Sequence, residues 1–414
     1  MDVRPFRALR YDPAVAGDPA RTSAPAYDAL EPLAYASHRE ASPYTVLELH
    51  APDGAYQRAA TLYRRWLRSG VLVPDEGPAL YRYEEHELVA GVPRVQRGLL
   101  AAVRLCPLDG SGDVLPHEDV DPARVTDRLR RVEEVPVELT PVHALVEDPP
   151  AQFAELLGGS PHAPPVVAAT DERGTDHRIW AIRDPSAVSE VAQALKGSRA
   201  VIADGHHRWA RSVALRDRRR ARESRGDEAP WERTLVYLVG PTDGPRVEAI
   251  HRLLQPVAPR QLARLAQDFV MEPAPGDARQ LEQRLAGAPP LSFGLVEPGG
   301  TGRVLVPRDP ASLRVRLPAE RRAAWSQLDA AVLTHAVLPA LGLPASAVHP
   351  RTDSGAAGRE VASTDDAALL VVRPMALDDV IRLAGAGQRL PPKTTRFLPK
   401  PRSGLVLRSL EDAP

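Results

Sequence analysis

The clearest local pattern of the chain is an apolar run that ends in a glycine turn and continues into three basic residues, Val201-Ile202-Ala203-Asp204-Gly205-His206-His207-Arg208. Residues 200–203 have strand length and include two β-branched side chains, whereas residues 209–223 contain no Gly or Pro and have apolar residues at helical spacing. The pattern therefore predicts a strand, a tight turn and a helix. Gly205 can adopt backbone angles that such a reversal often needs.

The first turn of this predicted helix is a candidate anion site. His206, His207 and Arg208 would lie beside free backbone N–H groups at the positive end of the helix dipole, and an arginine fork suits phosphate. Asp204 could cap the helix or orient one of the histidines. The alternative is that the histidines form only a hydrogen-bonded surface cap. A metal site is less favoured, because adjacent histidines do not share one helix face.

Composition places the chain among globular proteins. Its 414 residues, 43% of them hydrophobic, suffice for two or three compact units. The formal net charge of -1 provides no overall basic field that would attract nucleic acid or an anionic membrane. The single cysteine, Cys106, fits a reducing compartment. Because no signal-like segment or membrane span is visible, we expect a cytoplasmic protein.

Alternating helical and strand patterns predict an α+β fold with mixed sheets. We expect three units, 1–158, 166–256 and 257–414, with a Pro-rich junction at 158–165. The last unit would end in a basic Pro-rich tail. Expected helices cover 56–69, 122–134, 186–195, 260–268, 278–285 and 319–338. Expected strands cover 79–87, 94–106, 166–169, 177–182, 234–239, 247–254, 292–296, 304–306 and 369–372, with a hairpin turn at 299–302.

A series of short motifs follows one order along nearly the whole chain. They are Arg4-Pro5-Phe6-Arg7-Ala8-Leu9-Arg10-Tyr11, Ala24-Pro25 with Tyr27-Asp28, Leu115-Pro116-His117-Glu118, Asp127-Arg128-Leu129, Ala203 to Arg208, His251-Arg252, and Pro391-Pro392-Lys393-Thr394-Thr395 with Phe397, Pro399-Lys400 and Gly404-Leu405-Val406. This series resembles an uncharacterised prokaryotic family, the domain of unknown function family 1015. The family name implies no reaction.

The turn from Asp204 to Arg208 also resembles the nucleotide-binding turn of the ParB and sulfiredoxin superfamily. That resemblance implies a ParB/sulfiredoxin-like unit that binds CTP or ATP, and free-serine kinases of the superfamily carry a similar Asp-Gly-His turn. Sulfiredoxins have a reactive cysteine where this chain has His206, so repair of sulfinic acids is not expected.

The chain departs from the family pattern at four places. Val120 stands where the family usually has threonine, Val125 or Arg124 where it has lysine, and Glu138 where it has asparagine. Ala26 replaces the second proline of an Ala-Pro-Pro-Tyr-Asp run. These losses could alter substrate contacts or weaken activity.

Other candidate residues are spread along the sequence. Glu118, next to His117 just before a helix, could act as general base or hold Mg²⁺, or the pair could cap the helix that starts at Pro122. Arg128 could be a second phosphate contact or a solvated charge. The remaining candidates are Lys393 and Lys400 in a tail that could clamp a phosphate or pack over the sheet, and Arg7, Tyr11, Tyr27 and Asp28 as cleft residues.

The sequence thus predicts a nucleotide-dependent phosphotransferase that acts on a small hydroxyl metabolite, and the superfamily resemblance implies free serine. The nucleotide would be ATP, ADP or CTP, with Mg²⁺ as a candidate cofactor. His206 and His207 would donate to the transferred phosphate, and Glu118 would be base or Mg²⁺ ligand. The alternatives are a nucleotide-sensing protein without turnover and a metal-dependent hydrolase built on His117, Glu118, His206 and His207.

Overall fold

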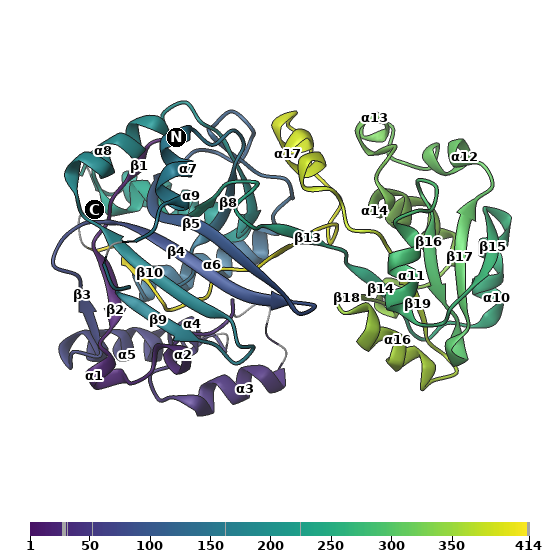
Figure 1. The fold of residues 1–414 in the computed structure, drawn as a ribbon, viewed down its shortest axis with the longest axis horizontal. Helices are drawn as coiled ribbons and strands as arrows, with labels where there is room; N and C mark the ends of the chain where they lie inside the picture. The colour runs from purple at the N-terminus through teal and green to yellow at the C-terminus, as the bar shows by residue number, and fades with distance from the viewer. Residues whose placement is uncertain (27–29, 31, 52, 162, 224, 412–414) are drawn as a thin grey trace. The chain divides into compact units, whose positions relative to one another are not determined.

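The computed structural model describes residues 1–26, 30, 32–51, 53–161, 163–223 and 225–411. Its contacts group into two compact units, one formed by Met1–Pro245 with Pro399–Pro414 and the other by Arg246–Leu398. The chain therefore leaves the first unit, builds the second and returns (Figure 1). The fold is α+β with mixed and antiparallel sheets, which confirms the expected class.

Unit 1 is built around a nine-stranded mixed sheet. Along its main path the strand order is β6-β11-β8-β12-β5-β4-β10-β9, and β1 pairs with β5. The strands are β1 (Val3–Arg4), β4 (Leu80–Val89), β5 (Val92–Arg104), β6 (Val114–Leu115), β8 (Val142–Val146), β9 (Val167–Thr170), β10 (Asp176–Ile182), β11 (Ala200–Asp204) and β12 (Arg233–Val239). Strand β11 is parallel to β6 and antiparallel to β8.

This sheet joins two segments that the sequence suggested as separate units. Strand β11 lies between β6 and β8, and β12 lies between β8 and β5. Residues 166–256 thus contribute strands between those of residues 1–158. The Pro-rich passage 158–165 connects α7 (Ala151–Gly158) to β9 inside unit 1, because strand pairing, rather than proline content, defines the unit.

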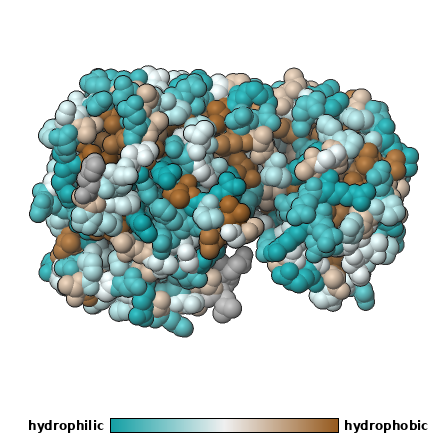
Figure 2. Space-filling model, in the orientation of Figure 1, coloured by the Kyte–Doolittle hydropathy of each residue, from teal (hydrophilic) through white to brown (hydrophobic). Residues whose placement is uncertain are grey.

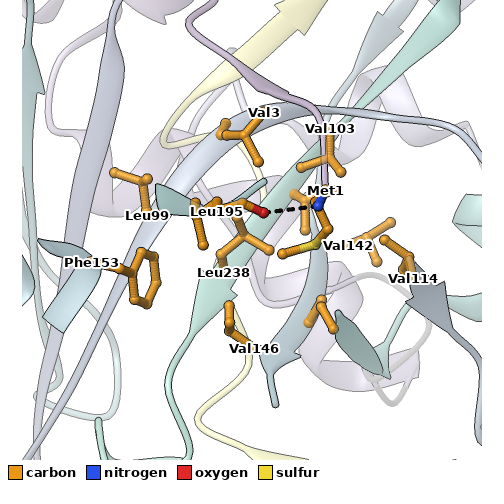
Figure 3. Close-up of a cluster of buried hydrophobic side chains, with 14 of the residues drawn as sticks. Met1, Val3, Leu99, Val103, Val114, Val142, Val146, Phe153, Leu195 and Leu238 are labelled. Carbon is orange, nitrogen blue, oxygen red and sulfur yellow. Dashed lines mark hydrogen bonds between the residues drawn. The ribbon is translucent and has the colours of Figure 1, made fainter. Parts of the chain in front are cut away.

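One face of the sheet covers an apolar core. Leu99, Val142 and Leu238 from three strands pack with Phe153 of α7 (Figure 3). The N-terminal ammonium group of Met1 donates to Leu195 O at 2.8 Å at the edge of this core. Because side chains alternate along a strand, the opposite face carries different residues.

That opposite face is buried and carries several polar side chains. His143 of β8 lies with its ring 5.5 Å from Tyr237 of β12, whose ring is 5.0 Å from Tyr83 of β4. The returning C-terminal segment contacts this face, since Gln96 Nε2 donates to Pro399 O at 3.2 Å. The packing of this segment agrees with a tail that runs over the sheet.

A second sheet of unit 1 brings the two ends of the chain together, in the order β3-β2-β21-β7. It contains β2 (Ala8–Tyr11), β3 (Leu72–Pro74), β7 (Val137–Glu138) and β21 (Leu407–Ser409). The helices of unit 1 besides α7 are α1 (Pro13–Ala16), α2 (Pro19–Thr22), α3 (Pro32–Ala41), α4 (Leu47–His50), α5 (Tyr56–Arg68), α6 (Pro122–Glu134), α8 (Pro185–Ala194) and α9 (His206–Arg220). Helices α6 and α9 pack against each other.

Unit 2 contains an antiparallel six-stranded sheet with the order β15-β17-β16-β19-β14-β18. Its strands are β14 (His251–Leu254), β15 (Phe269–Ala274), β16 (Phe293–Val296), β17 (Gly302–Pro307), β18 (Val348–Arg351) and β19 (Ala368–Val371). A separate pair, β13 (Arg246–Glu248) and β20 (Arg396–Leu398), forms where the chain enters and leaves the unit. The longer helices are α11 (Ala278–Leu285), α16 (Ser354–Ala362) and α17 (Leu377–Gly385).

Two predicted elements of unit 2 are wrong in extent. Residues 247–254 form β13 and β14, which pair with different sheets. Residues 319–338 do not form one helix, because Leu328 has extended backbone angles and the Trp325 indole donates to Arg389 O at 2.9 Å. The segment instead contains α13 (Arg322–Trp325), α14 (Asp329–Val332) and a π-helical turn that leads into α15 (Leu338–Leu341).

Among the helices of the described ranges, none has both the length and the apolar composition that crossing a bilayer requires. Hydrophobic residues on the visible face are scattered among hydrophilic ones (Figure 2). The large hydrophobic side chains that are exposed in the described ranges are Val15, Leu88, Val92, Val270 and Val315.

Candidate anion-binding site

The strand, turn and helix predicted around Gly205 are present. Strand β11 ends at Asp204, Gly205 has a left-handed φ of 104°, and α9 begins at His206. A Cβ atom at Gly205 would lie 2.9 Å from the Nε and Nη2 atoms of Arg208. Glycine is therefore favoured by the backbone angle, and the guanidinium group of Arg208 folds back over the space that a side chain at this position would take.

Asp204 does not cap the helix, so that prediction is wrong. The N-cap residue is Gly205, and the Asp204 carboxylate accepts from Arg208 Nη2 and from Lys400 Nζ, each at 2.6 Å. Burial would raise the pKa of Asp204, but the charges and hydrogen bonds of Lys400 and Arg208 outweigh burial and hold it below its usual range. The carboxylate thus fixes two cations at the turn.

The histidines of α9 hold the segment that carries His117 and Glu118. His206 Nε2 accepts from the backbone N–H of His117 at 3.1 Å, and His207 Nε2 accepts from that of Asp121 at 2.9 Å. The rings of His117 and His206 meet edge to face at 4.6 Å. The four predicted residues His117, Glu118, His206 and His207 therefore gather at one end of α9.

Neither His117 nor Glu118 caps α6, because its N-cap is Asp121, whose side chain accepts from Ala123 N. His117 Nδ1 lies 2.6 Å from Ile202 O, and its Nε2 is 3.8 Å from Glu118 Oε1. The Glu118 side chain is 29% exposed. A carboxylate in this position can reach both the protein and solvent.

Two pairs of arginines converge between α6 and α9. Arg128 and Arg131 lie three residues apart on α6, and Arg208 and Arg211 lie three residues apart on α9, so each pair shares a helix face. All four are buried, between 3% and 9% exposed. Together with His50, Leu139 and Thr140 they line a pocket whose cavity volume is about 20 Å³. Arg128 and Arg208, predicted separately, are thus brought together.

The described lining of the pocket is basic. None of the described residues that line it is Asp or Glu. Asp204 serves Arg208 but also binds Lys400. Glu138 Oε1 lies 3.7 Å from Arg211, while its other oxygen accepts from Arg408 at 3.0 Å. The carboxylates of Asp204 and Glu138 are therefore each shared with a second cation.

Arg208 also keeps an unused donor. Its Nε atom is buried and has no hydrogen-bond partner within the described ranges. A buried donor without an acceptor costs free energy that an anionic ligand would recover. The pocket therefore has the chemistry of an anion site.

His50, Thr140, Arg131 and Arg211 were not predicted from the sequence. The repeated spacing of Arg128 with Arg131 and of Arg208 with Arg211 was an available signal, because it places each pair on one helix face. His50 and Thr140 carry no comparable signal, since they reach the pocket from α4 and from the residues after β7.

Glu138, a departure from the family pattern, belongs to a buried polar network. Its carboxylate accepts from the Thr234 hydroxyl, from Leu235 N at 2.8 Å and from Arg408 Nη1 at 3.0 Å. The residue joins β7, β12 and β21. Of the other departures, Val120 and Val125 are half-buried and Ala26 is buried.

The remaining predicted residues are not among the described residues that line the pocket. Lys393 belongs to unit 2, where its carbonyl accepts from Arg252 Nη2 at 3.1 Å. Arg7 Nε donates to Asp75 O at 2.6 Å, and Tyr11 is buried in the core beneath the small sheet. Tyr27 and Asp28 lie outside the described residues. Within the described ranges, no three His, Cys, Asp or Glu side chains are grouped so that they could hold a metal ion.

Comparison with known proteins identifies a family model that matches most of the chain. The family model described as "Protein of unknown function (DUF1015)" matches residues 3–331. No curated protein matches the sequence.

Among solved structures, a free serine kinase in complex with AMP matches with 14% identity and a TM-score of 0.37, over 76% of this chain and 92% of that chain. A mutant of the free serine kinase in complex with ADP matches with 14% identity and a TM-score of 0.37, over 77% and 94%. A conserved hypothetical protein from Pyrococcus furiosus matches with 13% identity and a TM-score of 0.35, over 76% and 97%. At these values no chemistry carries over from the matched structures.

Proposed function

Because the chain belongs to the DUF1015 family of proteins of unknown function, we propose from its own residues that it binds a nucleotide by the phosphate groups and transfers a phosphoryl group to a small hydroxyl metabolite. The observation that supports this proposal is the pocket between α6 and α9, where four buried arginines converge. Converging guanidinium groups offer several charge-assisted hydrogen-bond donors to a polyanion.

A phosphate group suits the pocket better than a carboxylate does. Guanidinium groups from two helices approach from different sides, and a terminal phosphate presents three oxygens and about two negative charges to them. The cavity volume of about 20 Å³ accommodates little more than one water molecule. In this proposal the pocket therefore holds the oxygens of a phosphate end, while sugar and base lie outside it.

Phosphoryl transfer depends mainly on positioning and charge neutralisation. We assign the acceptor base to Glu118, which is partly exposed beside the α9 turn. The acceptor oxygen forms a bond to the terminal phosphorus, the bond from that phosphorus to the leaving nucleotide breaks, and the hydroxyl proton passes to Glu118. His206 and His207 act as positioning residues, because their Nε2 atoms accept from the segment that carries Glu118.

The nucleotide in this proposal is ATP, ADP or CTP. In its alternative role, Glu118 would supply one oxygen ligand to Mg²⁺, an ion that takes its other ligands from phosphate and water. Free serine is the first acceptor to test, because the turn from Asp204 to His206 resembles that of free-serine kinases.

A second candidate function is nucleotide binding without turnover. It is favoured by Val120, a half-buried apolar residue two positions after Glu118, where the family usually has a hydroxyl. Loss of that hydroxyl next to the proposed base would leave the arginine pocket unchanged.

Calorimetry and product analysis separate these functions. The protein is titrated with ATP, ADP and CTP, with and without Mg²⁺, and then incubated with the same nucleotides and a panel of hydroxyl metabolites that includes serine. Binding with a phosphorylated product supports the transferase, whereas binding with intact nucleotide supports the sensor. If no nucleotide binds, or if Arg208→Ala binds as well as the unchanged protein, the proposed site is wrong. Arg130→Ala, an exposed position on α6, is the matched control.

A further inference from the structure

Lys400 lies in the segment that returns to unit 1, and the residues on both sides of it are fixed. Pro399 O accepts from Gln96 Nε2 at 3.2 Å, and the buried Arg402 side chain donates to carboxylates and a carbonyl of the unit. Pro399 and Pro401 flank the lysine, and proline fixes its own φ and restricts the residue before it. The fold therefore presents Lys400 from a rigid backbone.

The ammonium group of Lys400 is only partly used by the protein. Its Nζ donates to Asp204 Oδ1 at 2.6 Å, and Asp204 is its one hydrogen-bond or ion-pair partner within the described ranges. An ammonium group carries three N–H donors, and this side chain is 24% exposed. The remaining donors are therefore available to a ligand or to solvent.

One carboxylate connects Lys400 to the arginine pocket. The second oxygen of Asp204, Oδ2, accepts from Arg208 Nη2 at 2.6 Å. Arg208 lines the pocket, whereas Lys400 is not among the described residues that line it. The ammonium group thus lies next to the pocket and not within it.

The bridge formed by Asp204, Arg208 and Lys400 combines one negative with two positive charges. His143, which pairs with Asp204 across β8 and β11, adds no charge at neutral pH, because burial lowers its pKa to about 4. An anionic group beside Lys400 therefore meets a net positive bridge, although Asp204 is acidic.

The size of the pocket limits which ligand can use both cations. The cavity volume of about 20 Å³ has room for no more than the oxygens of one phosphate group. A ligand that contacts Arg208 in the pocket and Lys400 beside it needs a second anionic group close to the first. A diphosphate has two such groups, joined by one bridging oxygen. A single phosphate in the pocket would leave the ammonium group with Asp204.

We infer that Lys400 binds a second phosphate beside the one held in the arginine pocket, so that the site selects a diphosphate group over a single phosphate. This inference rests on the proposed function, because it requires a phosphate among the arginines of the pocket. It makes Lys400 a specificity-determining residue. The diphosphate can belong to a nucleotide or be inorganic pyrophosphate, and the affinities for these two compounds distinguish the sources.

Calorimetry with AMP, ADP and pyrophosphate, without Mg²⁺, tests the inference. We expect the unchanged protein to bind ADP at least about tenfold more tightly than AMP, since a charge-assisted contact is gained. Lys400→Met should lose most of this ratio, mainly through weaker binding of ADP. Lys196→Met, which changes an exposed lysine of unit 1, should keep the ratio.

A double variant separates the contact made by the ammonium group from a general change of charge. Lys400→Met leaves Asp204 with one cation fewer, which weakens the binding of every anion. Lys400→Met combined with Asp204→Asn keeps the net charge of the bridge, and it should still bind ADP and AMP with similar affinity. If the double variant regains the ratio, charge balance rather than a contact explains the selectivity, and the inference is wrong.

Labelling of the unchanged protein gives a test that needs no substitution. The chain has three lysines, Lys196, Lys393 and Lys400, so acetylation can be read at each of them by peptide mass spectrometry. Saturating ADP should lower the acetylation of Lys400 relative to the other two, and AMP should lower it less. Equal protection by both nucleotides, or protection by neither, contradicts the inference.

The outcomes separate the two proposals. Equal affinities for AMP and ADP, or an unchanged ratio in Lys400→Met, overturn the role of Lys400 and leave the arginine pocket standing. If none of the three compounds binds, the pocket and the inference are both wrong. If pyrophosphate binds as tightly as ADP and loses as much affinity in Lys400→Met, the role of Lys400 is supported and the nucleotide of the proposed function is wrong.

Discussion

Unit 1 contains two kinds of buried arginine, and their surroundings differ. Arg402 donates to Asp171 at 3.3 Å, to Glu172 at 2.9 Å and to Ser23 Oγ at 2.8 Å. In the pocket between α6 and α9, four arginines converge while the adjacent carboxylates are shared with other cations. Arg402 thus has its counter-charges within the fold. The described residues that line the pocket include four arginines and no acidic residue, and such a cluster suits an anionic ligand.

Arg408 follows the pattern of Arg402. It donates to Glu138 at 3.0 Å and to the carbonyls of Pro230 and Arg233. The same residue type therefore ties strands together at one place and lines a pocket at another. Local sequence does not distinguish the two, because the difference depends on how many carboxylates the fold places nearby.

The largest loss of stability is expected for Arg402, whose counter-charges lie within the fold. Arg402→Met leaves Asp171 and Glu172 without their buried cation, so the free energy of unfolding should fall by about 3–5 kcal/mol. Urea unfolding followed by tryptophan fluorescence measures it, since Trp66, Trp180, Trp209 and Trp231 lie in unit 1. Arg199→Met, which breaks the exposed pair with Glu147, should cost about 1 kcal/mol or less. Equal losses in both variants would contradict the comparison.

For an arginine of the pocket, we expect a smaller change in the free energy of unfolding and a large loss of nucleotide affinity. Arg131→Met removes one of four converging positive charges and a hydrogen bond to Val137 O at 3.3 Å, and the free energy of unfolding should fall by less than in Arg402→Met. Nucleotide affinity, measured by calorimetry, should fall by roughly tenfold to a hundredfold because a charge-assisted contact is lost. Arg130→Met should leave affinity unchanged. A strong loss of stability without loss of affinity in Arg131→Met would show that this arginine is structural.

A smaller, pH-dependent change in the free energy of unfolding is expected for Asp204, whose single carboxylate pairs with two cations. Because the folded-state pKa of Asp204 lies below its usual value, its contribution to stability is complete above the unfolded pKa of about 4 and is lost as the pH falls below that. The unfolding free energies of the unchanged protein and Asp204→Asn should therefore differ most near neutral pH and converge in acid. Asp217→Asn, at an exposed site, is the control. A difference that does not vary with pH would argue against the charged pairings.

The smallest change in the free energy of unfolding is expected for the buried residue His143. It is 0% exposed, neither ring nitrogen has a hydrogen-bond partner within the described ranges, and burial lowers its pKa to about 4. His143→Leu removes unpaired polar atoms, so the free energy of unfolding should stay equal or rise by about 1 kcal/mol. A clear loss of stability in urea unfolding would show that His143 has a partner in solution.

Much of the fold could be predicted from local sequence. Helix α6 covers the predicted residues 122–134, and the β4–β5 hairpin and the turn at Gly205 also lie where expected. Five helices begin with an Asp-Pro pair, in which the aspartate accepts from a backbone N–H and proline occupies the first helical position. These features depend on neighbours in the chain.

Predictions from the sequence were wrong where contacts between residues far apart in the chain determine the structure. The strand expected at 247–254 divides because β13 and β14 pair with different partners. The helix expected at 319–338 is interrupted near Leu328, where the indole of Trp325 is tied to Arg389. Apolar periodicity does not record such contacts.

The amino-acid sequence by itself determined the strand, glycine turn and helix around Gly205, the individual phosphate candidates Arg128 and Arg208, and the α+β class. Only the tertiary structure decided that α6 and α9 pack together, that Arg131 and Arg211 join the same pocket, and that His50 lines it with them. The physical reason is range: backbone angles and helix caps are set within a few residues, whereas the electrostatic balance of a buried pocket is the sum over charges that only folding brings together.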